Sequence, residues 1–566
     1  MASARPGSAR VARALLAVGI LGMVGASAAA GTAAPPRLAV TGDHATLLVS
    51  LAAAPEEAAA RAALRGLGDV APVAPEAGVW SVAGPADPAV RLAALRRPGV
   101  QSAEWSLLRR SDERRRPHAG PATPLPLTPV GAPTDQYYAN GRQWALFPPA
   151  TTWGIDLTGT PPRPRIAILD SGIDSTHPEW SGPGSPLVRP YSAWTGRQSA
   201  EDWGKTGHGT HVAGSAAAPA NGLGVVGVAP GAIGTAEVIP VQISDRDGYS
   251  TDETMMKGIR WSVQNGAKVI NISAGGVGDS ATFQRVVDWA FSSGALIVAS
   301  VGNDGQDYGA INYPAGYWNV LGVAAQCSGA SDPVDCPTPY GLAAFSTRNA
   351  SVDIVAPGVD IVSSVPPRVR QGEVSPGYAV KEGTSMAAPF VSGVAALVFA
   401  ANPGATPFQV LRQLKNTAVD MGPAGRDPGT GAGLINPRAA VTLPLPKDDA
   451  FESNADIPQV ARYQAIRPTT SVSAFAAVDD DPTDVYPVSM RKGQVLRLTG
   501  RANGVKTRLA IWAPGTRTIT SGAPAAKTAG ASRSPRLAYA IPRTGRWYVS
   551  VKAVSGSGQY ALRVAG

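Results

Sequence analysis

The chain has 566 residues, which exceeds the usual size of one domain and predicts several folded units. Its 64 Gly and 51 Pro residues indicate many turns and exclude a protein built from long coiled helices. The formal net charge is +9, and residues 1–116 contribute 14 basic and 9 acidic residues to it. Because no basic stripe or RNA-binding motif accompanies this mild surplus, we expect no nucleic-acid partner.

The N-terminus has the pattern of a secretory signal peptide over residues 1–30. Three arginines precede an apolar run over Ala14–Val24, and Ala28–Ala30 offers small residues at a cleavage site. A membrane anchor is the alternative, but the run is shorter than the roughly 20 apolar residues of a spanning helix. We therefore expect a secreted, extracellular protein with no integral membrane anchor after signal removal.

Residues 37–108 predict a small α+β unit. Strand and helix candidates alternate in the order 46–51, 55–67, 78–82, 87–97 and 100–105. This alternation suits a split βαβ arrangement.

Residues 109–134 predict an exposed linker. Arginines crowd its start, including Arg109 and Arg110, and Pro, Ala, Gly and Thr dominate the rest. Such a segment cannot bury enough apolar surface to order itself, and exposed chain of this kind is a good protease target. The alternative is a plain basic spacer.

Residues 135–442 predict an α/β unit with a mostly parallel sheet and helices on both faces. Near-continuous apolar strand candidates, separated by helix candidates, are typical of a sheet that is covered on both sides. These strand candidates are 165–169, 267–272, 296–300 and 318–323. The helix candidates include 251–264 and 282–292.

Residues 448–566 predict an all-β sandwich. Short alternating strand candidates are separated by Gly and Pro turns, with no strong helix between them. These candidates are 495–498, 508–512, 537–541, 547–551 and 560–564.

An aspartate ends the first strand candidate of the α/β unit. Asp170 follows the apolar run 165–169 and so reaches the carboxyl edge of the expected sheet. Open parallel sheets place ligands and catalysis at that edge. An Asp that caps a turn is the plain alternative.

Two of the chain's 5 histidines lie in the segment Gly207–Gly214. A helix that begins here would hold His208 at its exposed start, where histidine can transfer protons near neutral pH. Metal binding is an alternative, but the spacing of the two histidines differs from that of an H-E-x-x-H zinc site. We expect His211 to pack beneath the site.

A serine lies at the start of a long apolar helix candidate. The backbone N–H of Ser385 would have no helical acceptor there and could bind an oxyanion. We expect Pro389 to mark the first turn of this helix, because proline is tolerated there. The alternative role of Ser385 is that of an ordinary N-cap residue.

Together, the segments Ile168–Asp174, Gly207–Gly214 and Gly383–Pro389 resemble the Asp, His and Ser signatures of the subtilisin-like serine proteases. Their order along the chain is also that of subtilisin. The resemblance covers residues 135–442 and implies a subtilisin-like fold. It also implies a serine endopeptidase that cleaves protein or peptide substrates with the triad Asp170, His208 and Ser385, and that needs no cofactor for its chemistry.

The resemblance implies further site residues. Asn303 corresponds to the side chain that donates to the oxyanion, although a turn residue before Gly305 is the alternative. Substrate-binding residues would be Gly248, Tyr249, Ser250, Ser273, Ala274 and Gly275, with Asn312 near the floor of the specificity pocket. Glu179 and Asn221 fall where the family can place ligands of a structural calcium, although the family more often has Asp at the position of Glu179.

The flanking units carry resemblances of their own. Residues 37–108 resemble the inhibitory propeptide of the family, which would make the chain's own propeptide a partner of its active site. Residues 448–566 resemble the bacterial pre-peptidase C-terminal domain, chiefly at Thr483–Tyr486 and Gly545–Val551.

The two cysteines, Cys327 and Cys336, bracket a short loop. In an exported protein they predict a single disulfide. Two other classes of protein remain open for the whole chain: a binding protein on a protease scaffold without catalysis, and a processing protease anchored at the cell surface.

Overall fold

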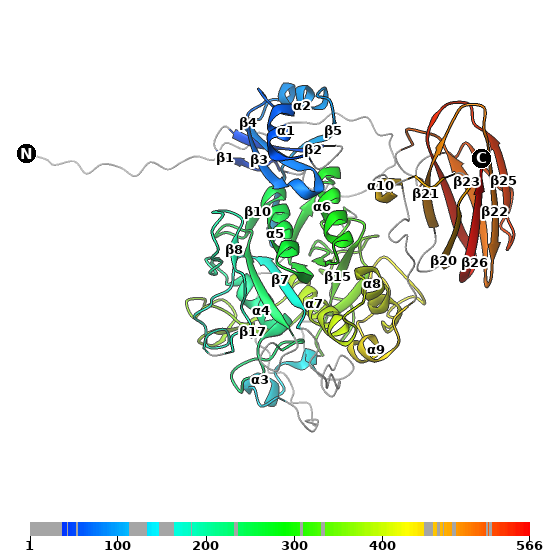
Figure 1. Ribbon diagram of the computed structural model, residues 1–566. Coiled ribbons are helices and arrows are strands. Elements are labelled where there is room, and N and C mark those ends of the chain that lie inside the picture. The colour runs from blue at the N-terminus through cyan, green and yellow to red at the C-terminus, as the bar shows by residue number, and fades with distance from the viewer. Residues whose placement is uncertain are drawn as a thin grey trace, which may run out of the picture.

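The computed structural model describes residues 37–41, 44–51, 55–111, 133–146, 163–182, 184–230, 236–305, 310–329, 334–446, 457–460, 465–467, 469–477, 483–516, 519 and 523–566. The expected signal peptide, residues 1–30, lies outside these ranges, as do residues 112–132 of the expected linker. Figure 1 shows an N-terminal unit in blue, a central unit from cyan to yellow, and a C-terminal unit in orange and red.

The N-terminal unit is an antiparallel sheet with two helices. Its elements are β1 (Val40–Thr41), β2 (His44–Leu51), α1 (Glu57–Ala63), β3 (Asp69–Ala74), η1 (Pro75–Ala77), β4 (Val79–Pro85), α2 (Pro88–Leu95) and β5 (Val100–Trp105). Strand β2 pairs with β4 on one side and with β5 on the other. The strand β3 was not expected, because Pro72 and the exposed Asp69 interrupt its apolar pattern. It lies at the edge of the sheet, where a proline is tolerated.

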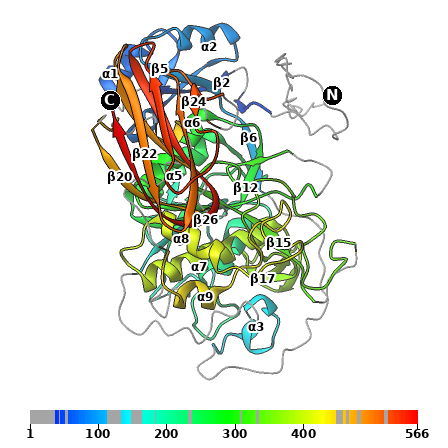
Figure 2. The ribbon, with the colours of Figure 1, turned by 90° about the vertical axis from the view of Figure 1, so that its right-hand side faces the viewer.

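Residues 109–111 differ from the exposed linker that the sequence predicts. They belong to β6 (Leu108–Ser111), which pairs antiparallel with β10 (Tyr249–Thr251) and with β12 (Ala274–Val277). Figure 2 shows β6 beside β12. Main-chain hydrogen bonds from two neighbouring strands order this segment, which its basic composition did not predict.

The central unit contains a seven-stranded sheet in which all the neighbouring strands are parallel. From one edge to the other, its strands are β16 (Ile354–Pro357), β15 (Val320–Gln326), β13 (Leu296–Ser300), β11 (Ala267–Ile272), β7 (Arg165–Asp170), β9 (Glu237–Gln242) and β8 (Tyr191–Ser192). Nearly every residue of the five middle strands is buried, which confirms the predicted parallel sheet.

Helices cover this sheet. They are α4 (His208–Ala217), α5 (Asp252–Gln264), α6 (Ala281–Ser292), α7 (Thr384–Ala401), α8 (Pro407–Asn416) and α9 (Pro437–Thr442), preceded by the short α3 (Gln136–Ala139) and η2 (Trp144–Leu146). Helix α4 packs on α7, and α5 packs on α6. Within the described residues, one helix, α7, has the length and apolarity of a membrane span, but 94% of its apolar window is buried inside the unit.

Helix α7 begins earlier than Pro389 predicts. The helix starts at Thr384, so Pro389 lies inside it and not in the first turn. A proline cannot donate to the carbonyl four residues before it, which here is the carbonyl of Ser385. The hydroxyl of Ser273 donates to that carbonyl at 2.9 Å. The lost helical bond is thereby replaced, and the helix continues through Pro389.

Smaller elements complete the central unit. A three-stranded sheet contains β17 (Ile361–Ser364), β18 (Glu373–Ser375) and β19 (Tyr378–Lys381), and β14 (Asn312–Tyr313) pairs with β12. Cys327 and Cys336 form a disulfide, as the sequence predicts, and both are buried.

The C-terminal unit is a β-sandwich that shares one long strand between its two sheets. It contains α10 (Ile457–Val460), β20 (Ser471–Ala477), β21 (Thr483–Met490), β22 (Val495–Ala502), β23 (Val505–Trp512), β24 (Ala526–Lys527), β25 (Arg536–Ala540) and β26 (Gly545–Ala565). The sequence predicts two separate strands at 547–551 and 560–564, but both belong to β26. The first half of β26 pairs with β21 and β23, and its second half pairs with β20 and β22. The glycines between the halves let the strand pass from one sheet to the other without a turn.

Candidate active site

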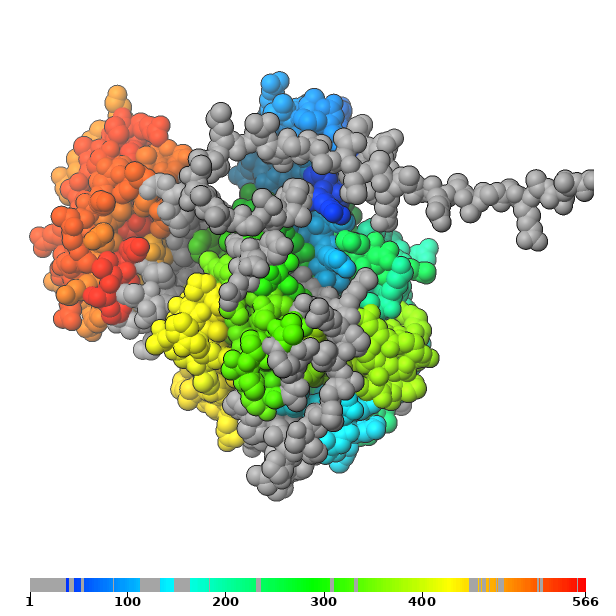
Figure 3. Space-filling view, turned by 180° about the vertical axis from the view of Figure 1, so that it is seen from behind, coloured from blue at the N-terminus to red at the C-terminus, as the bar shows by residue number. Residues whose placement is uncertain are grey.

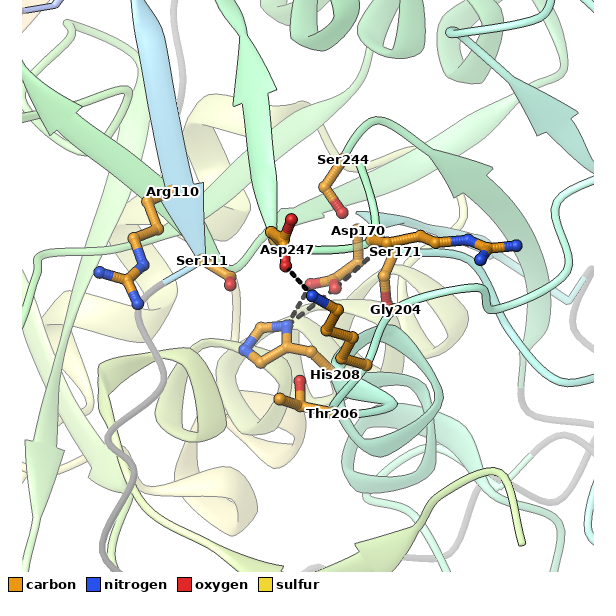
Figure 4. Close-up of a pocket in the computed structure, with 12 residues that line it drawn as sticks. Arg110, Ser111, Asp170, Ser171, Gly204, Thr206, His208, Ser244 and Asp247 are labelled. Atoms are coloured by element: carbon orange, nitrogen blue, oxygen red, sulfur yellow. Dashed lines mark hydrogen bonds and ion pairs between the residues drawn. The ribbon is translucent and has the colours of Figure 1, made fainter. Parts of the chain in front are cut away.

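Asp170 and His208 meet at the carboxyl edge of the central sheet. Asp170 is the last residue of β7, and His208 is the first residue of α4. The Nδ1 atom of His208 lies 2.8 Å from Oδ1 and 2.9 Å from Oδ2 of Asp170, and both side chains are almost fully buried. Figure 4 shows the imidazole facing this carboxylate at one side of a pocket.

The start of α4 packs closely on the turn that follows β7. A Cβ atom at Gly209 would lie 2.2 Å from the carbonyl oxygen of Gly172, so only glycine permits this approach. The buried carboxylate of Asp202 joins the two segments, because it accepts bonds from Thr210 N at 3.0 Å and from Ser171 Oγ at 2.9 Å. Burial raises the pKa of Asp202 in spite of these bonds. Asp202 could not be recognised from the sequence, because its role depends on two segments that fold against it.

His211 packs beneath the site, as expected. Its Nε2 atom lies 3.0 Å from the carbonyl oxygen of Ile361 and 3.2 Å from that of Ala379. Full burial lowers the pKa of His211 well below its ordinary value, so the ring is neutral at physiological pH. Among the residues that the structure describes, no three His, Cys, Asp or Glu side chains gather in a way that could hold a metal ion.

Ser385 lies in the first turn of α7. Its hydroxyl donates to the carbonyl of Ser273 at 3.0 Å, and the side chain is buried. In the first turn of a helix, the backbone N–H groups have no helical acceptor, and they carry the positive end of the helix dipole. Ser385 therefore places a hydroxyl group next to a backbone donor suited to a negative oxygen.

The amide of Asn303 is fixed beside the start of the same helix. Its Oδ1 atom accepts bonds from Thr384 N at 2.9 Å and from Thr384 Oγ1 at 3.0 Å. Because the backbone N–H of Thr384 can only donate, these bonds settle which end of the amide is oxygen and which is the NH₂ donor. The role of Thr384 could not be recognised from the sequence, because it requires α7 to lie next to the turn after β13.

Asn312 lies on the side of β12 that faces away from β6, where it pairs with Val277. It belongs to β14, and its amide donates to the carbonyl of Val301 at 2.9 Å. A Cβ atom at Gly302 would lie 1.7 Å from this amide nitrogen, so the turn between Val301 and Asn303 needs glycine. The expected position of Asn312 at the floor of the specificity pocket stays a prediction.

The predicted substrate edges face each other across β6. Tyr249 and Ser250 pair with Arg110 and Arg109 on one side. Gly248 accepts a hydrogen bond from the backbone N–H of Ser111 at 3.0 Å. On the other side, Ala274 and Gly275 pair with Ser111 and Arg110, and Ser273 is the residue that contacts Ser385. The residues predicted to bind substrate thus hold an extended strand from the chain itself.

Glu179 and Asn221 lie together with a carboxylate that the sequence analysis did not single out. Glu179 accepts bonds from Val225 N at 2.8 Å and from the amide of Asn221 at 3.3 Å. Asp135 accepts the backbone N–H of Asn221 at 3.1 Å. Burial is the main cause that raises the pKa of Glu179 to about 7, and Asp135 adds to the rise.

Asp252, at the first position of α5, is a third buried carboxylate, after Asp202 and Asp135, that the sequence did not single out. It is fully buried and forms an ion pair with Arg109 at 2.6 Å. Burial, the largest influence on both groups, disfavours their charges and raises the pKa of Asp252. For Arg109, Asp252 and the hydroxyls of Tyr317 and Tyr313 together outweigh burial, so the pKa of the guanidinium is raised. An acid in the first turn of a helix is common for electrostatic reasons alone, so the sequence held no signal for a binding role.

The central unit is similar to known proteins. The model of the subtilase family matches residues 163–433. M-protease from Shouchella clausii is 37% identical over 317 residues, which cover 74% of that protein and 54% of this chain. Subtilisin Savinase from Lederbergia lenta is 40% identical over 276 residues, which cover 90% of that protein and 49% of this chain.

Fervidolysin from Fervidobacterium pennivorans is also similar. It is 37% identical over 331 residues, which span 54% of this chain but only 45% of fervidolysin. In the comparison with its crystal structure, the TM-score is 0.61 at 23% identity, and the match covers 91% of this chain and 86% of that one. The shared fold therefore extends beyond the segment whose sequence is similar.

The central fold and the protease relatives define a serine-type endopeptidase, which is a hydrolase. The chain belongs to the subtilase family.

Proposed function

We propose that the chain is a secreted endopeptidase whose catalytic triad is Asp170, His208 and Ser385. The observation that supports it most is the bond of 2.8 Å between His208 Nδ1 and Asp170, beside a channel that already holds an extended strand. With its proton kept at Nδ1, the imidazole uses Nε2 as the general base. The signal-like pattern of residues 1–30 supports secretion.

In the proposed reaction, Ser385 attacks the peptide carbonyl while His208 removes the hydroxyl proton. His208 then protonates the leaving amine, and water hydrolyses the acyl-enzyme in a second round of the same proton transfers. Asp170 holds the imidazole in one tautomer and stabilises its charged form. Asn303 and the N–H of Ser385 donate to the oxyanion. Subtilases need no cofactor for this chemistry.

A fluorophosphonate probe tests the proposed nucleophile in the mature enzyme. We expect one labelled residue, Ser385, because the probe forms a stable bond only with a serine that a neighbouring base activates. The modified peptide is identified by mass spectrometry. An active enzyme that carries the label on another serine would contradict the assignment.

We propose that residues 37–111 form an inhibitory propeptide. Figure 1 shows the blue N-terminal unit against the green helices of the central unit, and Figure 3 shows blue atoms next to green ones. Glu76 pairs with Arg260 of α5 at 2.8 Å, and Glu104 accepts the hydroxyl of Ser280, the N-cap of α6, at 2.6 Å. These contacts hold the unit over α5 and α6, and β6 then fills the channel that a substrate would need.

The maturation prediction follows from the position of β6. We expect the mature enzyme to begin between Leu108 and Gln136, because a competent channel must be cleared of β6. N-terminal sequencing of active enzyme from the culture medium checks the position. An active form that still begins near Gly31 would show that the N-terminal unit is a permanent domain without an inhibitory role.

We propose that Asp135, Glu179 and Asn221 hold a structural calcium ion. The donor set is made of oxygen ligands, as calcium prefers. The Oδ2 atom of Asp135 is buried and has no hydrogen-bond partner among the described residues. Two buried carboxylates so close together disfavour each other's charge, and a bound cation would remove this cost.

Removal of calcium is expected to lower the melting temperature by at least about 5 °C, because an ion that binds only the folded state stabilises it. The measurement compares thermal unfolding of the Ser385→Ala protein in calcium and in a chelator. Glu179→Gln should abolish the difference, while Glu237→Gln, which removes a pair with Arg165 at the surface, should keep it. The same melting temperature in both buffers would refute the site.

A further inference from the structure

The side chain of Arg109 fills a closed, polar pocket beneath α5 and β12. Its Nε atom donates to Asp252 Oδ1 at 2.6 Å, and its Nη atoms donate to the carbonyl oxygens of Gly276 at 2.6 Å and Gly278 at 2.9 Å. The carbonyl of Val277 accepts a further bond at 3.1 Å. The side chains of Arg109 and Asp252 have no exposed surface. One carboxylate and three carbonyl groups therefore surround one guanidinium.

This pocket belongs to the core and not to the N-terminal unit. All four acceptors lie in residues 252–278, which border the substrate channel, and only the guanidinium comes from β6. When β6 leaves the channel, the pocket keeps its carboxylate and carbonyl oxygens without their cation, and Asp252 also loses the backbone N–H of Leu107, which it accepts at 3.1 Å. This carboxylate and these carbonyl oxygens favour the binding of another cation, because a charge away from water without a partner has a high free energy.

The register of β6 gives the position of this pocket along a substrate. Ser111 pairs with Ala274 and Arg110 with Gly275, so the next residue of a strand in this register would lie opposite Ser273. The carbonyl of Ser273 contacts the hydroxyl of Ser385, which places the attacked peptide bond at that residue. The substrate residue opposite Ser273 is then the first before the scissile bond. The residues in the places of Ser111, Arg110 and Arg109 are the second, third and fourth before it.

We propose that Asp252 makes this endopeptidase selective for peptides with arginine at the fourth position before the scissile bond. The inference rests on the proposed function, and it adds the class of substrate. Arginine fits better than lysine, because a planar fork of donors can reach a carboxylate and several carbonyls at once, whereas an ammonium group is a compact point charge. Leucine or glutamate would leave Asp252 buried without a partner.

The test uses internally quenched peptides that differ only at the fourth position, where they carry Arg, Lys, Leu or Glu. Their common background is a sequence that the mature enzyme is first shown to cut, with the cleavage site verified by mass spectrometry. We expect kcat/KM for the Arg peptide to exceed that for the Leu peptide on the order of 10²-fold, since separating a buried charge pair carries a penalty of this size. The Lys peptide should fall between them.

The Asp252→Asn enzyme should lose most of this preference, with an Arg-to-Leu ratio below about 10, because the neutral amide keeps the shape but not the charge. Glu253→Gln is the matched control. Glu253 is the adjacent acid on α5 and pairs with Lys257 at 2.9 Å, so its loss should leave the ratio unchanged.

The outcomes separate the two proposals. An enzyme that cuts all four peptides at similar rates overturns the selectivity and leaves the proposed function intact. The same holds if Asp252→Asn keeps the wild-type ratio. An enzyme that cuts no peptide and takes no fluorophosphonate label overturns the proposed function itself. If Asp252→Asn is not secreted in folded form, the ratios of the wild-type enzyme for Arg, Lys and Leu still decide the selectivity.

Discussion

Ser385→Ala is expected to reduce proteolysis by about 10⁶-fold, the size of the effect known for the nucleophile of subtilisin, a relative of this chain. The change removes the atom that would form the acyl-enzyme. In the described part of the chain the hydroxyl donates one hydrogen bond, to the carbonyl of Ser273 at 3.0 Å. The fold should survive, because the side chain is small and its place in the first turn of α7 suits alanine. The measurement is hydrolysis of a denatured protein substrate by purified enzyme, with circular dichroism as the check on folding.

Ser392→Ala is the matched control for this experiment. Ser392 lies on the same helix and is also buried, and its hydroxyl donates to Asn271 at 2.9 Å. Its loss should lower stability slightly and leave turnover near the wild-type value. If the first cleavage of the chain is autocatalytic, Ser385→Ala should also accumulate as the uncut precursor. Normal proteolysis by the Ser385→Ala protein would refute the triad.

Asn303→Ala is expected to slow turnover by about 10²–10³-fold, a range measured for the corresponding donor in subtilisin. The amide of Asn303 is held by Thr384, so its NH₂ group is already oriented when negative charge develops on the substrate oxygen. The loss should therefore appear in kcat and leave KM almost unchanged, because the donor acts chiefly in the transition state. Steady-state kinetics on one peptide substrate separate these two constants.

Two further results make the Asn303 prediction specific. Fluorophosphonate should still label Ser385 in the variant, because the nucleophile and its base are intact. Asn402→Ala, which removes a bond of 3.1 Å to Val398 at the far end of α7, should have normal kinetics. A variant at Asn303 that raises KM but keeps kcat would instead assign the side chain to substrate binding.

The chain order of strands and helices in the central unit could be predicted from the sequence. Runs such as 165–169 and 296–300 are apolar throughout, and this pattern occurs where both faces of a strand are buried. The same local pattern puts Asp170 at the end of a strand and His208 and Ser385 at the starts of helices. A polar residue at the end of a strand or helix can be recognised in the sequence because it directly follows or precedes an apolar run.

Contacts between distant segments decided the remaining features. Arg109 was expected in an exposed linker because its neighbours are basic, yet it is buried against Asp252, which lies 143 residues away in the chain. Pro389 was expected to mark the start of a helix, but it lies inside α7. The helix can continue through the proline because the hydroxyl of Ser273 donates to the carbonyl of Ser385, which the proline cannot pair. The orientation of Asn303 likewise depends on Thr384 in α7.

By itself, the sequence determined which residues could carry the chemistry and at which ends of the strands and helices they lie. These features depend on residues adjacent in the chain, whose spacing and polarity act locally. The tertiary structure alone decided which of these residues meet, that β6 lies between β10 and β12, and that Asp252 pairs with Arg109. These features depend on hydrogen bonds and charge pairs between segments far apart in the chain, and such partners become neighbours only when the sheet and its helices have packed.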